Sequence, residues 1–228
     1  MRKLMIAVFA LAALSLIFAA CEKLEDEIND AVGQTESFDL DITDEPVPMY
    51  AIEQAGYKLT AVCYSETVTI NTLMSATDYA DLWNSAKSHI DDIEIKDMTY
   101  KIGKNRVAEG GNLDIFLLSS VPSPLVPPDG VDIDLSSLDF VLVDPTKLPN
   151  DKRIARIEIP AGTNVNSWTD ATFLSGGESE LEDQLLDFTS PFAFCLRLAV
   201  PTHGVELDME PDLEIELATS FDVTLTPL

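Results

Sequence analysis

A run of alternating side chains close to the C-terminal end constrains the fold more than any other feature of this chain. Over residues 213–225 (LEIELATSFDVTL) the apolar side chains share one parity, which only Thr219 interrupts, and polar, acidic or small side chains occupy the other. Successive side chains of a β-strand point to opposite faces, so the pattern predicts a strand about 40 Å long with one buried face. Burial on one face only is typical of an antiparallel sheet and argues against a parallel α/β fold.

Further segments rich in β-branched and aromatic residues follow one another at short intervals, with turn signals between them. Two of them, residues 93–102 and 131–143, change phase by one residue, which predicts a β-bulge or a strand that passes from one sheet to another. The strand-like segments are residues 38–43, 57–73, 93–102, 113–118, 131–143, 153–160, 192–200 and 213–225.

Within residues 37–228, two segments show helical spacing of apolar residues. The first is 77–90, with Thr77 or Ser75 placed to cap it, and the second is 175–187, which opens on a sequence resembling a capping box at Ser175. Many short strands with two helices predict a mainly β fold, namely an antiparallel β-sandwich-like domain with two short helices.

The charge balance excludes some classes of partner. The 228 residues include 14 basic and 40 acidic ones, for a net charge of −26, while 46% hydrophobic residues suffice for a packed core. A chain this acidic repels nucleic acid and anionic membrane surfaces. The acids could form a solvating surface, calcium sites or a field for a basic partner. Their even spread along the chain favours the solvating surface.

The N-terminal segment MRKLMIAVFALAALSLIFAAC has the layout of a secretory signal. Arg2 and Lys3 form a basic start, an uncharged apolar run follows, and two alanines precede Cys21. This arrangement resembles the signal and lipobox of bacterial lipoproteins, which implies cleavage before Cys21 and attachment of lipid to its thiol. The alternative is an uncleaved membrane anchor. It is disfavoured because the apolar run falls at or below the roughly 20 residues of a spanning helix.

The resemblance divides the chain into a signal peptide at 1–20, an acidic tether at 21–36 and a β-rich domain at 37–228. It implies a location in the bacterial cell envelope, with lipid anchoring at the outer membrane on its periplasmic face or at the cell surface. Loss of Arg2 and Lys3 with the signal leaves 12 basic residues against 40 acidic ones. Charge therefore cannot hold the protein on a membrane, and we expect the lipid on Cys21 to do so alone.

Few residues offer recognisable chemistry. The two histidines, His89 and His203, stand apart in the sequence, and signatures of zinc proteases, serine hydrolases, nucleotide-binding loops and thiol redox proteins are absent from it. Cys63 and Cys195 both fall in apolar strand-like runs. In an exported protein they either form a disulfide or remain two separate buried thiols.

Calcium is the one cofactor that the sequence suggests. Its best candidate site is a loop-to-strand junction with closely spaced acids at Asp129, Asp132 and Asp134. The spacing does not match an EF-hand, and alternating acids on a strand are more typical of a solvated face.

Two features could serve binding. Residues 121–130 (VPSPLVPPDG) contain four prolines and are either a binding or membrane-dipping loop, or a stiff connection folded back on the domain, which we favour. Trp168 lies among polar loop-like residues and could stack on a sugar. The low aromatic content of 7% favours partial burial against the sheet instead.

These observations favour a lipid-anchored envelope protein that acts as a binding or structural module for an envelope protein or glycan, without enzymatic activity. The alternatives are an envelope hydrolase that uses carboxylates and a carrier of an apolar ligand. The hydrolase requires a cleft with a carboxylate pair whose pKa values are pushed apart, and the carrier requires an internal apolar pocket.

Overall fold

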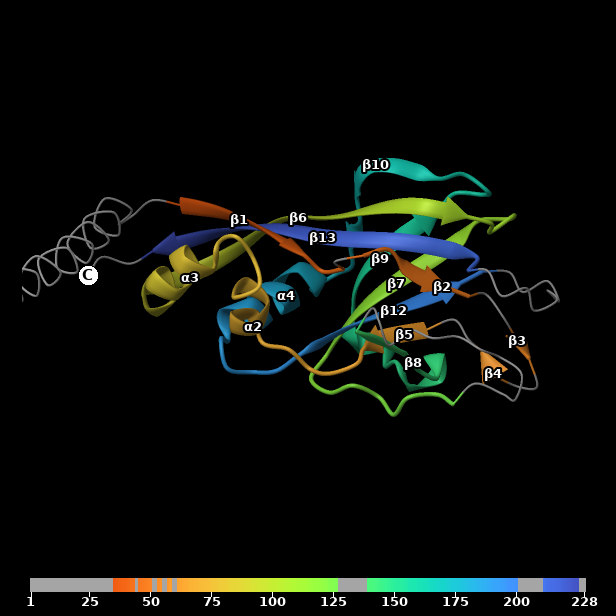
Figure 1. Cartoon of the computed structure of the whole chain (residues 1–228), viewed down its shortest axis with the longest axis horizontal. Helices are drawn as coiled ribbons and strands as arrows, with labels where there is room; N and C mark the ends of the chain where they lie inside the picture. The colour runs from red at the N-terminus through yellow and green to blue at the C-terminus, as the bar shows by residue number, and fades with distance from the viewer. Residues whose placement is uncertain are drawn as a thin grey trace, which may run out of the picture.

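The computed structural model describes residues 35–43, 45–50, 53–54, 57–58, 61–126, 139–200 and 211–225. Over these ranges the chain forms two antiparallel sheets, as the sequence predicts (Figure 1). The two sheets share one large apolar core. A short ribbon pairs β3 (Glu53–Gln54) with β4 (Tyr57–Lys58). Cys21, the signal peptide, most of the tether, His203 and the candidate calcium ligands Asp129, Asp132 and Asp134 lie outside the described residues.

The first sheet is built around the long C-terminal strand. Its order is β1–β13–β6–β10, and β2 also pairs with β13. Its strands are β1 (Thr35–Asp41), β2 (Val47–Met49), β6 (Ile90–Asn105), β10 (Val165–Asp170) and β13 (Leu213–Leu225). The predicted one-sided burial of β13 is confirmed. Thr219 is buried as well, and its hydroxyl donates to the Asp97 carbonyl oxygen at 2.8 Å.

The phase change predicted in 93–102 is a bulge. Phe221 of β13 pairs with Ile95, whereas the preceding Ser220 pairs with Asp97, which leaves Lys96 as the extra residue of β6. This bulge lets Ile95 and Met98 both point into the core despite their odd separation.

The second sheet has the order β11–β9–β7–β12–β5–β8. Its strands are β5 (Ala61–Tyr64), β7 (Gly111–Leu118), β8 (Phe140–Leu142), β9 (Arg153–Ile159), β11 (Thr172–Phe173) and β12 (Ala193–Ala199). The central strands β7 and β12 are buried on both faces because a smaller apolar cluster covers part of the outer face. This outer cluster consists of Ala61, Cys63, Phe116, Leu118, Val143, Leu148 and Cys195.

Within the outer cluster, Cys63 of β5 and Cys195 of β12 are directly opposite each other and form a disulfide. Their Cα atoms are 4.0 Å apart, and both residues are fully buried. Of the two alternatives that the sequence leaves open, the structure therefore contains the disulfide.

The helices differ in part from the prediction. They are α2 (Ile70–Met74), α3 (Ala80–Ala86) and α4 (Gly177–Leu186), with short 3₁₀ turns η1 (Lys87–His89), η3 (Pro145–Lys147) and η4 (Asn150–Lys152). The sequence predicts strand through Leu73, which covers most of α2. The helix forms there because the Thr69 hydroxyl caps the Thr72 amide and because Ile70 and Met74, four residues apart, are both buried. In Figure 1, α2, α3 and α4 lie toward the same end of the sheets.

The predicted helix caps are also wrong. Helix α3 begins only at Ala80, after Tyr79, and no side chain caps it. Helix α4 has Gly176 at its N-cap, in the left-handed conformation, so the Ser175 hydroxyl does not form the predicted capping box. None of the helices in the described part of the chain has the length and apolar character needed to cross a membrane.

The described part of the proline-rich segment, residues 121–126, folds back on the domain. The Leu125 amide donates to the Leu142 carbonyl oxygen at 2.7 Å, and Val121 and Leu125 pack against the core. Val126, by contrast, is 80% exposed.

Candidate functional site

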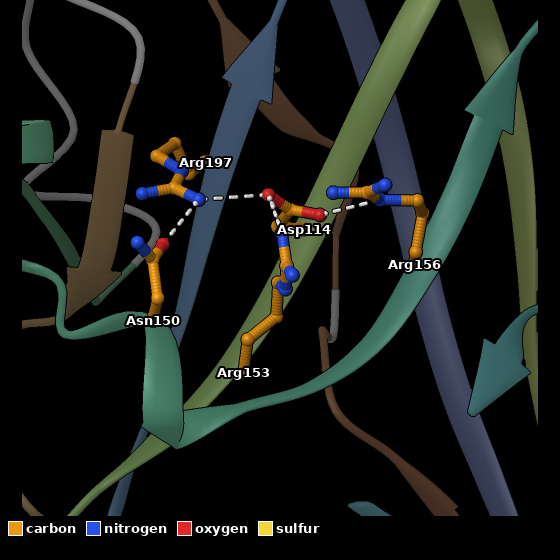
Figure 2. A network of polar contacts seen from close by, with 5 residues as sticks. All are labelled: Asp114, Asn150, Arg153, Arg156 and Arg197. Atoms are coloured by element: carbon orange, nitrogen blue, oxygen red, sulfur yellow. Dashed lines mark hydrogen bonds and ion pairs between the residues drawn. The ribbon is translucent and has the colours of Figure 1, made fainter. Parts of the chain in front are cut away.

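The outer face of the second sheet carries a cluster of three arginines around one buried carboxylate. Asp114, in the middle of β7, is directly opposite Arg156 of β9 on one side and Arg197 of β12 on the other. Directly paired residues of an antiparallel sheet share a face, so all three side chains project from the same surface. Figure 2 shows their guanidinium groups converging on Asp114 together with that of Arg153. We call Asp114, Arg153, Arg156 and Arg197 the arginine cluster.

Arg153 reaches this face because of a bulge in β9. Ile115 of β7 pairs with Ala155, but the next residue, Phe116, pairs with Arg153, so Ile154 is the extra residue. In a regular strand, residues 153 and 156 would point to opposite faces because their separation is odd. With the bulge, Ile154 and Ala155 both enter the core and the arginines on either side of them share the outer face.

The start of α4 presses against this bulge. The Leu174 amide donates to the Ile154 carbonyl oxygen at 2.9 Å. A Cβ atom added to Gly177 would lie 2.0 Å from the same oxygen, so only glycine allows the helix to approach this closely. Beside this contact, Lys152 forms an ion pair with Glu180 of α4 at 2.6 Å. The helix thus fixes the backbone that positions Arg153.

The carboxylate of Asp114 accepts three charged hydrogen bonds. Arg156 Nε donates to its Oδ1 at 2.7 Å, and Arg153 Nη1 and Arg197 Nη2 donate to its Oδ2 at 3.1 and 2.9 Å. Burial of the carboxyl group acts to raise the pKa of Asp114, but the three guanidinium donors outweigh burial and hold the pKa below its ordinary value. Asp114 is therefore ionised in the folded protein at neutral pH.

Two further contacts hold Arg197 in place. Its Nη2 also donates to the Asn150 Oδ1 at 3.2 Å (Figure 2). Its guanidinium lies 4.7 Å from the centre of the Phe116 ring. The ring supplies a cation–π contact and excludes water from one side of the guanidinium. Arg197 is thus held by Asp114, Asn150 and Phe116 together.

The cluster carries an excess of positive charge that reaches solvent. Three guanidinium groups and one carboxylate leave a net charge of +2, and three of the five arginines in the chain are used here. The side chains of Arg153, Arg156 and Arg197 are 26, 36 and 20% exposed, against 2% for Asp114. Within the described ranges, Arg153 Nε is buried without a hydrogen-bond partner. Guanidinium groups held in this way can bind the oxygens of a carboxylate or phosphate.

The residues singled out from the sequence occupy different places. Cys195 lies two residues before Arg197 on β12, so the disulfide flanks the cluster. Trp168 lies in β10 of the first sheet, in a strand and not in a loop; it is 43% exposed with Lys101 Nζ 4.1 Å from its ring centre. In the described part of the chain, no three or more His, Cys, Asp or Glu side chains converge as a metal site.

Sequence reasoning missed the arginine cluster. The available signal was Asp114, a charged residue inside the apolar run 113–118, because such a residue must find partners when the strand is buried. The identity of those partners depends on the strand order β9–β7–β12, which pattern alone does not provide.

Two surface pockets lie elsewhere. One of about 590 Å³ is open to solvent, and its rim includes the carboxyl-bearing residues Asp41, Glu45, Glu66 and Asp139. The other, of about 570 Å³, lies between residues 118–125 and the segment that carries Lys147 and Lys152. Neither is an enclosed apolar cavity of the kind that a carrier requires.

Carboxyl groups with a shifted pKa do not suggest acid–base catalysis. In the described part of the chain, the carboxyl groups with a shifted pKa are Asp114, Asp144, Asp187 and Asp222. Nearby hydrogen-bond donors lower the pKa of each of these groups, to about 2 for Asp187. A general acid would need a raised pKa.

No protein-family model and no curated protein matches the chain. Among solved structures, a chain from Desmodium yellow mottle tymovirus matches 85% of this chain and 87% of its own length, with 10% identity and a TM-score of 0.32. A chain from tobacco necrosis virus matches 86% of this chain and 84% of its own length, with 10% identity and a TM-score of 0.31. A chain from the Israel acute paralysis virus pentamer matches 88% of this chain and 72% of its own length, with 19% identity and a TM-score of 0.24. TM-scores this low carry no argument about function.

Proposed function

We propose that this protein is a bacterial lipoprotein, held in the cell envelope by lipid on Cys21, whose β-sandwich domain is a binding module. The lipobox-like sequence before Cys21 supports the anchoring. The observation that supports binding is the arginine cluster, which presents a net charge of +2 on the outer face of the second sheet.

A purely structural role does not account for the composition of the cluster. One arginine is enough to neutralise a buried aspartate, and it can supply two parallel hydrogen bonds. The second and third arginines add like charges that repel one another within a small area. In a chain with 14 basic and 40 acidic residues, the grouping of three arginines in one place favours a role toward an external anion.

The alternatives have weaker support. The open pocket with a carboxylate rim does not suit an apolar ligand, and the shifted carboxyl groups have lowered rather than raised pKa values. Both the carrier and the hydrolase therefore stay without a supporting observation among the described residues.

The proposal is tested on the full chain expressed in a bacterium. Wild-type protein should incorporate radiolabelled palmitate and sediment with membranes, whereas Cys21→Ser should lose the label and leave the membrane fraction. For binding, the purified wild type and the double variant Arg156→Gln/Arg197→Gln are immobilised and compared for retention of envelope components. We expect retention on the wild type only. Absence of the label, or equal retention on both proteins, would contradict the corresponding half of the proposal.

A further inference from the structure

The charge of the whole molecule limits what the arginine cluster can bind. With 14 basic and 40 acidic residues, the chain repels any extended polyanion that would lie across its surface. At physiological ionic strength, however, fields are screened beyond about 8 Å, so a small ligand responds mainly to the charges nearest to it. At the cluster those charges are three guanidinium groups, the Asp114 carboxylate and the Glu158 carboxylate beside Arg156. The ligand that fits is therefore small.

The neighbours of the cluster on the same face confine it further. Asn112 of β7 lies two residues before Asp114 and pairs with Glu158 of β9. Glu158 is exposed, and its carboxylate therefore lies beside Arg156. In the other direction, Phe116 belongs to the covered apolar cluster. A negative side chain on one side and an apolar cluster on the other limit the positively charged part of this face to the arginines.

The arginines are also organised in advance. Each donates to Asp114, Arg197 is further held by Asn150 and Phe116, and the bulge against α4 sets the position of Arg153. Side chains already fixed lose little rotamer freedom when a ligand binds. Asp114 thus acts as a positioning residue that holds three guanidinium groups together, which would otherwise repel one another.

We propose that the arginine cluster is a binding site for a small ligand that carries a phosphate dianion, either free or as a monoester. A phosphate monoester has a charge of about −1.5 to −2 at neutral pH and three strongly accepting oxygens on one atom. That concentrated charge suits three guanidinium groups gathered around a single buried carboxylate. A dicarboxylate has the same total charge but spreads it over two separated groups. This inference rests on the proposed function and specifies the ligand of its binding site.

The test is isothermal titration calorimetry on the full chain in detergent, at constant ionic strength, with inorganic phosphate, glycerol phosphate and succinate as ligands. We expect saturable binding of a phosphate ligand at one site and binding of succinate at least tenfold weaker. Tighter binding of glycerol phosphate would assign the site to a phosphate ester, and tighter binding of inorganic phosphate to the free ion. Equal binding of succinate, or no saturable binding of either phosphate ligand, would overturn the inference.

Variants place the binding on the cluster. Arg156→Gln and Arg197→Gln should each weaken phosphate binding about tenfold to a hundredfold, because each removes charged hydrogen bonds. Lys101→Gln makes the same charge change on the first sheet and should leave the affinity unchanged. Arg156→Lys and Arg197→Lys keep the charge but lose the planar fork, and we expect them to fold and bind with intermediate affinity. Arginine variants that bind as tightly as wild type would refute the assignment.

The outcomes separate this inference from the proposed function. If phosphate ligands fail but retention of an envelope component still depends on Arg156 and Arg197, the binding module stands and the ligand class is wrong. If phosphate binds at the cluster but palmitate is not incorporated, the ligand class stands and the lipid anchor is wrong.

Discussion

Replacement of Gly177 by alanine tests how the arginine cluster is built. The new Cβ would lie 2.0 Å from the Ile154 carbonyl oxygen, 2.6 Å from its carbonyl carbon and 2.7 Å from its Cα. All three are backbone atoms of the β9 bulge, so no side-chain rotation relieves the clash. Either the start of α4 or the backbone of the bulge must therefore move.

Helix propensity and packing change the stability of Gly177→Ala in opposite directions. Alanine in place of glycine favours a helix by up to about 1 kcal/mol, so propensity alone predicts a more stable protein. Overpacking against a fixed backbone costs about 1–3 kcal/mol. Because the helix start cannot tilt without losing the Leu174 to Ile154 hydrogen bond, we expect Gly177→Ala to be destabilised by about 1–3 kcal/mol in net terms.

The assay is urea unfolding followed by circular dichroism, with the free energy of unfolding extrapolated to water. Gly103→Ala is the matched control, because no heavy atom lies within 4 Å of the Cβ it would add. We expect the control to change the free energy of unfolding by less than about 0.5 kcal/mol. A Gly177→Ala protein as stable as wild type, with unchanged phosphate affinity, would show that the helix does not hold the bulge.

Three further predictions follow from Asp114 and the disulfide. Asp114→Ala leaves three neighbouring guanidinium groups without their shared acceptor. Because these groups are partly exposed, we expect the free energy of unfolding in urea to fall by about 2–3 kcal/mol. An unchanged free energy of unfolding would contradict the role of Asp114. The pKa of Asp114 is lower in the folded than in the unfolded state, so its contribution is fully present above the ordinary pKa of about 3.9 and is lost as pH falls through the folded pKa. The stability difference between wild type and Asp114→Asn should therefore be constant above about pH 5 and shrink in acid, and a constant difference down to pH 2 would refute the linkage. The Cys63–Cys195 disulfide joins residues 132 positions apart in the sequence. Its reduction should lower the free energy of unfolding by about 2–5 kcal/mol. The double variant Cys63→Ala/Cys195→Ala is the control, and its stability should not respond to reductant.

The elements set by local alternation could be predicted from the sequence. Residues 213–225 form one strand with one buried face, and the phase change between Ile95 and Met98 is the bulge that it indicates. Helix α2 could not be predicted, because Ile70–Met74 follows a run of β-branched residues and its helical state depends on the Thr69 cap and on tertiary burial. Here packing overrides intrinsic propensity.

The arginine cluster depends on contacts between distant parts of the chain. Asp114 meets Arg156 and Arg197 only because β9 and β12 both pair with β7, at separations of 42 and 83 residues. The bulge at Ile154 is equally non-local, since it is fixed by the start of α4. The sequence around it does carry a hint, because regular alternation in RIARIEI would leave Arg153 and Arg156 on opposite faces and bury one of them.

The most direct test of the central claim, that the arginine cluster binds a small anion, is calorimetric titration of inorganic phosphate into the wild type and into Arg156→Gln/Arg197→Gln at the same ionic strength. Thermal unfolding of both proteins first establishes that the variant is folded. We expect saturable binding at one site in the wild type and no detectable heat of binding in the double variant. Identical titration curves for the two folded proteins would contradict it.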